Sequence, residues 1–244
     1  MVHRKAHLTS PVALPGQPVK VPKKALAGRM ATKPCVLLTG FDAFGGETIN
    51  PSWQVCRALH GRQIAGHRLV AARLPSVFGE SLQALGELLR LHKPVLTICV
   101  GQAGGRSALS LERIAINVND ARIPDNAGAS PLDTPVVDGA PAAYFTGLPI
   151  KAILLALRHE GVAAEVSQTA GTFVCNHVFY GLMHALATQR GFKRARGGFI
   201  HVPYLPEQGT PSMTLADMTR GLQIAVRTAL GTTIDARFSS GAVQ

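Results

Sequence analysis

The sequence predicts a single-domain α/β fold in which a twisted, largely parallel sheet carries helices on both faces. Segments with helical periodicity alternate with short apolar runs along residues 34–244. Runs such as residues 94–101 are almost continuously apolar, which is typical of parallel strands buried on both faces. The 244 residues, 46% of them hydrophobic, suffice for one sizeable core, and composition does not shift within residues 34–244.

The first half of this region reads as two strand–helix units and a third strand. Asn50 suits a helix N-terminus, and Pro51 suits the first turn that follows it. The predicted elements are a strand at 34–44 running into a glycine loop, a helix at 50–61, a strand at 67–75, a helix at 76–92 and a strand at 94–101.

The second half continues the alternation after a loop-rich segment. The predicted elements are a strand at 111–120, a long loop at 121–147, a helix at 149–161 closed by Gly161, a short strand at 163–167, a helix following Cys175 with Asn176 at its N-terminus, a strand at 198–203 and a helix within 211–230. Ligands of such sheets gather where the strands end. Residues 39–46, 99–105, 170–175 and 200–206 all lie at or near such ends.

The net charge of +11 is concentrated at the N-terminus. Residues 1–33 hold seven Lys or Arg and no acid, which leaves 18 basic and 14 acidic side chains, or +4, for the rest. We expect residues 1–33 to be a basic leader outside the core, with Met30 as an alternative start. A nucleic-acid-binding function is the competing reading, but the body is only mildly basic and the leader has no interleaved aromatic residues. No specific nucleic-acid partner is therefore expected.

Cysteine usage and hydropathy indicate a reducing, cytoplasmic setting without membrane insertion. The four cysteines show neither C-x-x-C nor zinc-like spacing, and no secretory signal pattern opens the chain. The longest apolar runs, such as "PVLTICV", are too short to span a bilayer.

Several common functional motifs are incomplete or absent in this sequence. "GFDAFGGE" has Gly46 where a phosphate-binding loop needs lysine, "GQAGGR" lacks dinucleotide-binding spacing, and no G-x-S-x-G is present. "HEGVA" does not complete H-E-x-x-H, so neither a metal nor a cofactor is expected. The missing phosphate cradle also counts against a related architecture acting as a nucleoside phosphorylase.

Cys175 stands where a small-residue segment becomes an amphipathic helix, in "SQTAGTFVCNHVFYGLMH". It is either a small buried apolar residue or a nucleophile whose thiolate is favoured by a helix N-terminus. A nucleophile needs a base, and His201 at the end of a buried strand, 26 residues later, is a candidate. His177 and His184 compete, but His177 should point away from Cys175 on the helix. Candidate orienting carboxylates are Glu112, Asp120 and Asp125.

Five motifs in order resemble the pyroglutamyl peptidase I family of cysteine peptidases over about residues 34–230: "TGFDAFGGETINPS", "GQAGGRSALSLERIAINVNDARIPDN", "DTPVVDGAPAAYF", "SQTAGTFVCNHVFYGLMH" and "FIHVPYLPEQ". The resemblance implies removal of N-terminal pyroglutamate from peptides through a thioester. It also implies a triad of Glu112, Cys175 and His201, and commonly a homotetramer. Ala43 stands where the family's loop usually has proline, and residues 1–33 have no counterpart.

Pyroglutamate is a flat, neutral lactam, so its pocket should be apolar. Phe41 and Phe44 are expected to sandwich the ring. The family resemblance also suggests Ile123, Phe173 and Val174 for the pocket, and Arg122 beside the Cys175 backbone N–H as an oxyanion donor. Two alternatives stay open. Gln102 either pairs with the lactam or structures its loop, and Arg122 alternatively forms a salt bridge with Asp120 or Asp125.

Overall fold

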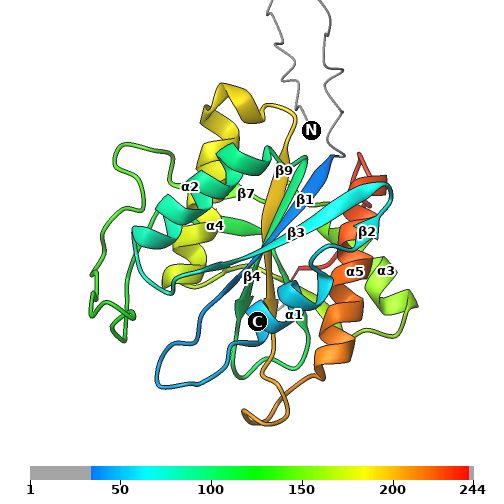
Figure 1. Ribbon diagram of the computed structural model, residues 1–244, viewed down its shortest axis with the longest axis horizontal. Coiled ribbons are helices and arrows are strands. Elements are labelled where there is room, and N and C mark those ends of the chain that lie inside the picture. Colours follow the sequence, from blue (N-terminus) through cyan, green and yellow to red (C-terminus); the bar gives the residue numbers. More distant parts are fainter. Residues whose placement is uncertain (1–33, 242–244) are drawn as a thin grey trace, which may run out of the picture. The chain divides into compact units, whose positions relative to one another are not determined.

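The computed structural model of the chain describes residues 34–241, so the basic leader expected at residues 1–33 lies outside the described residues. Its main sheet has seven strands in the order β2-β3-β1-β4-β9-β5-β8, of which β2, β3, β1, β4 and β9 are labelled in Figure 1. In chain order these are β1 (Cys35–Phe41), β2 (Gln63–Ile64), β3 (His67–Leu74), β4 (Leu96–Gln102), β5 (Leu109–Glu112), β8 (Ala164–Ser167) and β9 (Arg196–Val202).

Four of the strand pairs in this sheet are parallel, namely β1 with β3, β1 with β4, β4 with β9, and β5 with β8. The short β2 and the strand β5 run antiparallel to β3 and β9 respectively. The predicted α/β class with a largely parallel sheet is therefore confirmed.

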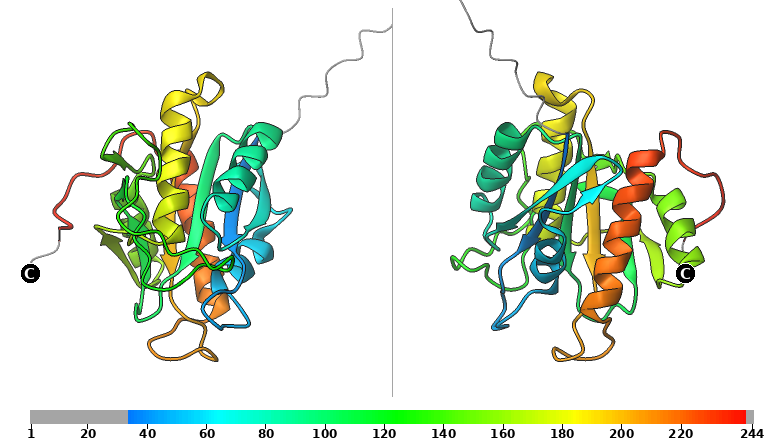
Figure 2. Two further views of the ribbon diagram at one scale, coloured as in Figure 1. Left: turned by 90° about the vertical axis from the view of Figure 1, so that its left-hand side faces the viewer. Right: turned by 45° about the vertical axis from the view of Figure 1, so that its right-hand side comes forward.

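Helices cover both faces of the sheet, as predicted (Figures 1 and 2). One buried cluster joins the sheet to α1, α3 and α5, and a second joins it to α2 and α4. The helices are α1 (Pro51–Leu59), α2 (Glu80–His92), α3 (Ile150–His159), α4 (Val174–Thr188) and α5 (Leu215–Gly231), with a short 3₁₀ turn η1 (Arg190–Phe192). Within residues 34–241, no helix is long and apolar enough to cross a membrane.

Local sequence explains where α1 begins and why it packs closely on β1. The Asn50 side chain accepts a hydrogen bond from the Ser52 N–H, and Pro51 occupies the first turn, as predicted. A Cβ at Gly40 would lie 2.5 Å from the Trp53 backbone nitrogen, so only glycine lets helix and strand approach this closely.

The predicted strand at 111–120 is wrong, because the chain changes sheets near Arg113. β5 ends at Glu112, and β6 (Ile114–Ile116) pairs instead with β7 (Ala143–Phe145) in a separate two-stranded sheet. β7 lies within the segment predicted as loop, where three residues are too few to stand out as a strand. Alternation identifies extended chain, but it cannot say which sheet a strand joins.

Candidate active site

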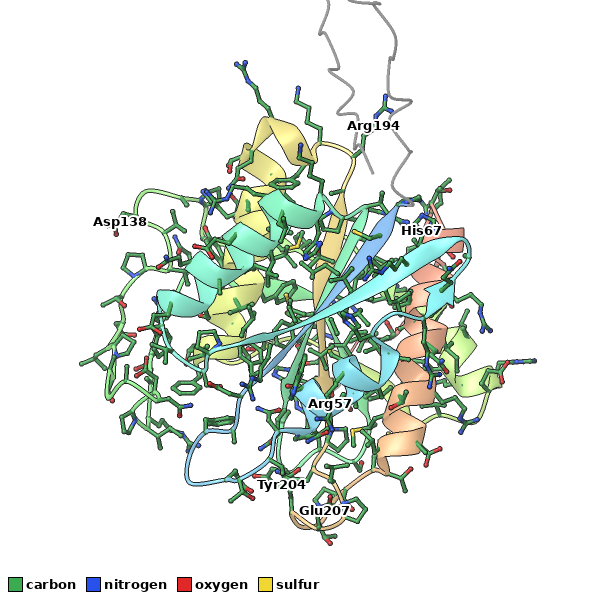
Figure 3. The ribbon with its side chains drawn as sticks, viewed as in Figure 1. Arg57, His67, Asp138, Arg194, Tyr204 and Glu207 are labelled. Atoms are coloured by element: carbon green, nitrogen blue, oxygen red, sulfur yellow. The ribbon has the colours of Figure 1, made fainter. Side chains whose placement is uncertain are left out.

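β1, β4 and β9 end together at one end of the sheet. Tyr204 and Glu207, labelled at the lower end of Figure 3, lie in the loop that follows β9, whereas Arg194 precedes β9 and lies at the opposite end. A Cβ at Gly104, just after β4, would come within 2.3 Å of the Tyr204 ring. The loops after β4 and β9 therefore pack tightly against each other, as expected for a ligand site at strand ends.

Cys175 lies in the first turn of α4. The helix begins at Val174, with Phe173 in the capping position, and no side chain caps its first N–H groups. The prediction that Asn176 opens the helix is wrong. Asn176 is buried within the first turn, where its side-chain amide donates to the carbonyls of Ile116 and Val118 and thereby anchors α4 to β6. The nucleophile candidate thus sits at the positive end of the helix dipole on a fixed helix.

The Cys175 sulfur lies against β4. A Cβ built on Gly101 would be 2.8 Å from Cys175 Sγ, although part of the Cys175 surface remains exposed. Burial raises the pKa of the Cys175 thiol to about 12, and the Glu112 carboxylate adds to the increase, while the Arg106 guanidinium opposes it. The thiol is therefore protonated at neutral pH, and its use as a nucleophile requires a base.

His201 is the histidine that the sheet register places on the same face as this sulfur. Its backbone pairs with Gly101 across the parallel strands β9 and β4, and paired residues of neighbouring strands project to the same face. The His201 imidazole is buried, with its centroid 4.8 Å from that of Phe199 in the cluster beneath α4. The sheet register therefore brings together the two residues that are 26 positions apart in sequence.

Glu112 completes this group from the end of β5. Its Oε1 lies 2.7 Å from His201 Nδ1, and its side chain is fully buried. Because an ionised carboxylate can only accept, this contact places the Nδ1 proton between them and leaves the second imidazole nitrogen unprotonated in the neutral ring. Of the three candidate carboxylates, Glu112 is therefore the one that contacts His201.

Arg106 is a residue of this group that the sequence does not single out. Its Nη1 lies 2.7 Å from the same Glu112 oxygen that contacts His201. The only sequence signal is an arginine ending "GQAGGR" directly after a buried strand. Nothing in that local pattern identifies its partner, because Glu112 belongs to the next strand.

The competing histidines have other roles in the structure. His177 is buried, with Nδ1 2.9 Å from Asn119 Oδ1, and its Nε2 accepts from the Gly79 N–H at 3.0 Å. Burial lowers the pKa of His177 to about 4. His184 contacts the Tyr144 hydroxyl at 3.0 Å. Both rings are thus engaged away from the Glu112 carboxylate.

The alternative partners of Arg122 are also accounted for. Burial tends to raise the pKa of Asp125, but hydrogen bonds from backbone N–H groups, including those of Phe78 and Ala129, bring it below its ordinary value. Across residues 34–241 the Arg122 side chain makes no hydrogen bond or ion pair. The salt bridge to Asp120 or Asp125 is not formed. The Arg122 guanidinium is therefore available to contact a ligand.

A cavity of about 420 Å³ opens beside the start of α4. Four residues predicted for the site line it, namely Phe44, Arg122, Ile123 and Phe173. Asp120, Gly171 and Thr172 complete the lining. The rings of Phe44 and Phe173 are 5.9 Å apart, and Phe78 meets Phe173 edge-on at 5.3 Å. Aromatic walls that contact each other in this way suit a small flat ligand.

Three predicted pocket residues lie outside that lining. Phe41 is 2% exposed and packs towards Phe199 in the core, and Val174 is equally buried. Gln102 Oε1 accepts a hydrogen bond from Gln208 Nε2 at 3.2 Å. Of its two alternatives, Gln102 therefore has the loop-structuring one, because this bond ties the end of β4 to the loop after β9. No group of three or more His, Cys, Asp or Glu suited to a metal ion occurs within residues 34–241.

A cysteine at a helix start, a histidine on the strand beside it and a buried carboxylate bound to that histidine define a thiol-dependent hydrolase on an α/β sheet. Comparison with known proteins identifies the family within this class. Residues 34–232 match the model of the pyroglutamyl peptidase family, and the chain belongs to that family.

Individual relatives agree with this assignment. The chain is 57% identical over 213 residues to the pyrrolidone-carboxylate peptidase of Cupriavidus taiwanensis, covering 85% of this chain and 98% of that protein. The enzyme of the same name from Klebsiella pneumoniae is 56% identical over 212 residues, with the same coverage. The crystal structure of pyroglutamyl peptidase I from Bacillus amyloliquefaciens superposes with a TM-score of 0.82 at 48% identity, covering 85% of this chain and all of that one.

Proposed function

We propose that this chain is a cysteine exopeptidase that removes an N-terminal pyroglutamyl residue from peptides. The observation that carries the proposal is the 2.7 Å contact between Glu112 and His201, on the face where the Cys175 sulfur lies against the strand position paired with His201. Membership of the pyroglutamyl peptidase family supplies the substrate class.

The chemistry follows from these three side chains. His201 takes the Cys175 proton as the sulfur attacks the pyroglutamyl carbonyl, and Glu112 holds the ring and offsets the charge of the imidazolium. The tetrahedral intermediate collapses as His201 protonates the departing amine, which leaves a pyroglutamyl thioester on Cys175. Water, deprotonated by His201, then hydrolyses the thioester and releases pyroglutamate. The free Cys175 N–H at the helix start and the unpaired Arg122 guanidinium are the proposed oxyanion donors.

The cavity beside α4 is proposed to receive the lactam ring. Phe44 and Phe173 supply aromatic walls, and Ile123 is 44% exposed at the rim. Aromatic walls are suited to the flat, neutral lactam ring of a cyclised residue. Phe41 and Val174 are proposed to support this pocket from the core behind it.

We further propose that residues 34–244 form a single catalytic domain that works in the cytoplasm as a homotetramer. All four cysteines are free, which suits a reducing compartment. Large apolar side chains on different elements are strongly exposed, including Phe145 at 70% and Leu91 at 74%, and a subunit interface would cover such residues. Light scattering of the purified chain should give four times the chain mass, and a monomer would contradict the tetramer.

The activity is tested by comparing three amide reporters that differ only in the N-terminal residue. The pyroglutamyl reporter should be cleaved with a kcat/KM at least about 100-fold above those of the prolyl and glutamyl reporters. Preference for either other reporter, or cleavage of none of them by the folded protein, would contradict the proposal.

A further inference from the structure

Two partners share a single oxygen of the buried Glu112 carboxylate. His201 Nδ1 and Arg106 Nη1 both lie 2.7 Å from Oε1, while Oε2 is buried without a hydrogen-bond partner within the described residues. A fully buried carboxylate needs compensating charge, and a neutral imidazole does not provide it. The arginine guanidinium is permanently charged and therefore provides it in every protonation state of His201.

Arg106 also contacts the segment that leads to the nucleophile. Its Nη2 donates to the Thr169 carbonyl at 3.3 Å, and Thr169 lies in the loop between β8 and α4. The arginine itself comes from the loop after β4, whose Gly105 has a φ of +83°. One guanidinium thus joins the loop after β4, the end of β5 and the approach to Cys175.

We propose that Arg106 is a positioning residue of the active site, which holds the Glu112 carboxylate towards His201 and balances its charge beside Cys175. This inference rests on the proposed function. With Arg106 in place, the Glu112 carboxylate is charge-balanced and stays directed at His201 Nδ1. The same positive charge favours the Cys175 thiolate, which the Glu112 charge alone disfavours.

The direction of the pH effect follows from the groups around Cys175. These are Glu112 from β5, Arg106 from the loop after β4, Cys99 from β4 and His201 from β9. Arg106 lowers the pKa of the Cys175 thiol, so its removal should raise that pKa further. A unit charge several ångströms away at an effective dielectric constant of about 20 shifts a titration by roughly one to two pH units.

The test compares Arg106→Gln, Arg106→Lys and a matched control, Arg113→Gln. Arg113 is also an arginine next to β5, but its Nε donates to the neutral Gln168 side chain at 2.8 Å, and within residues 34–241 it forms no ion pair with an acid. Two quantities are measured as a function of pH: the steady-state constants for the pyroglutamyl reporter, and the rate of Cys175 alkylation by iodoacetamide, read by mass spectrometry.

For Arg106→Gln we expect kcat at pH 7 to fall by roughly 10–100-fold with KM within about 3-fold, and the alkylation profile to move about one unit to alkaline pH. Arg106→Lys retains the charge and should keep the alkylation profile within about 0.3 unit. Arg113→Gln should match the wild type in both measurements.

An unshifted alkylation profile in Arg106→Gln would overturn the proposal. So would an equal shift in Arg113→Gln. A shift of about one unit in Arg106→Lys would also overturn it, and that result can be read even if Arg106→Gln fails to fold. Alkylation needs no substrate, so the two ideas can fail separately. If the wild type cleaves no reporter but the alkylation shifts appear as expected, the peptidase assignment is wrong and the role of Arg106 stands.

Discussion

Replacing Gly101 by alanine would place a methyl group where the Cys175 sulfur lies. The added Cβ would be 2.8 Å from Cys175 Sγ and 2.8 Å from the nearest atom of the Phe199 ring, whereas ordinary contacts begin at 3.4 Å. The sulfur, the ring or the strand must therefore move by at least about 0.6 Å. Overpacking of this kind typically costs ~1–3 kcal/mol of stability. A nucleophile displaced by up to about 1 Å can lose roughly 100-fold in rate.

We therefore expect Gly101→Ala to lower kcat for the pyroglutamyl reporter by roughly 10–100-fold while the protein stays folded. The assay is steady-state kinetics beside urea unfolding. Gly86→Ala is the matched control, because Gly86 lies within α2 with nothing within 4 Å of its Cβ position. That variant should keep wild-type kcat and gain up to about 1 kcal/mol in stability. Wild-type kcat in Gly101→Ala would refute the placement of the sulfur against β4.

Three further predictions concern other parts of the chain. His201→Ala should lose at least ~10⁴-fold in kcat, and Glu112→Gln should lose less, because an amide still orients the ring; the reverse order would contradict their roles. Burial lowers the pKa of His177 to about 4, below the unfolded value of ~6.5, so stability should be complete above pH 6.5 and fall by about 3 kcal/mol towards pH 4. Urea unfolding should show this fall, and an equal fall in His177→Asn would assign it to other groups. A chain starting at Met30 should keep wild-type kcat/KM and lose any salt-sensitive affinity for nucleic acid, since six of the seven basic residues before position 34 are removed; lost activity in the folded truncation would contradict this.

The fold class can be predicted from the sequence because buried parallel strands have a recognisable local pattern. Strands such as β4 and β9 are buried on both faces and appear as continuous apolar runs, and their carboxyl ends must lie together. The adjacency of Cys175 and His201 follows from that rule and from the register between Gly101 and His201. Residue types and topology therefore predict that both residues lie near the same end of the sheet, the register brings them together, and the family resemblance selects Glu112 as the carboxylate.

Features that depend on side-chain direction could not be predicted. Asn176 suits a helix cap, but its amide is equally able to satisfy the distant carbonyls of Ile116 and Val118, and only the packing of α4 decides between them. Phe41 sits at the end of a strand near the site, yet its ring enters the core beside Phe199. Arg106 resembles an ordinary surface arginine after a glycine turn until the antiparallel placement of β5 brings Glu112 to it.

The central claim is that the Cys175 thiol is the nucleophile for pyroglutamyl transfer, and turnover by Cys175→Ser and Cys175→Ala tests it most directly. Both variants are assayed with the pyroglutamyl reporter at enzyme concentrations that would reveal residual activity, beside circular dichroism to establish folding. Loss of the nucleophile should lower kcat by at least ~10⁴-fold in both variants without unfolding. A folded variant of either kind that retains more than about one hundredth of wild-type kcat would contradict the account.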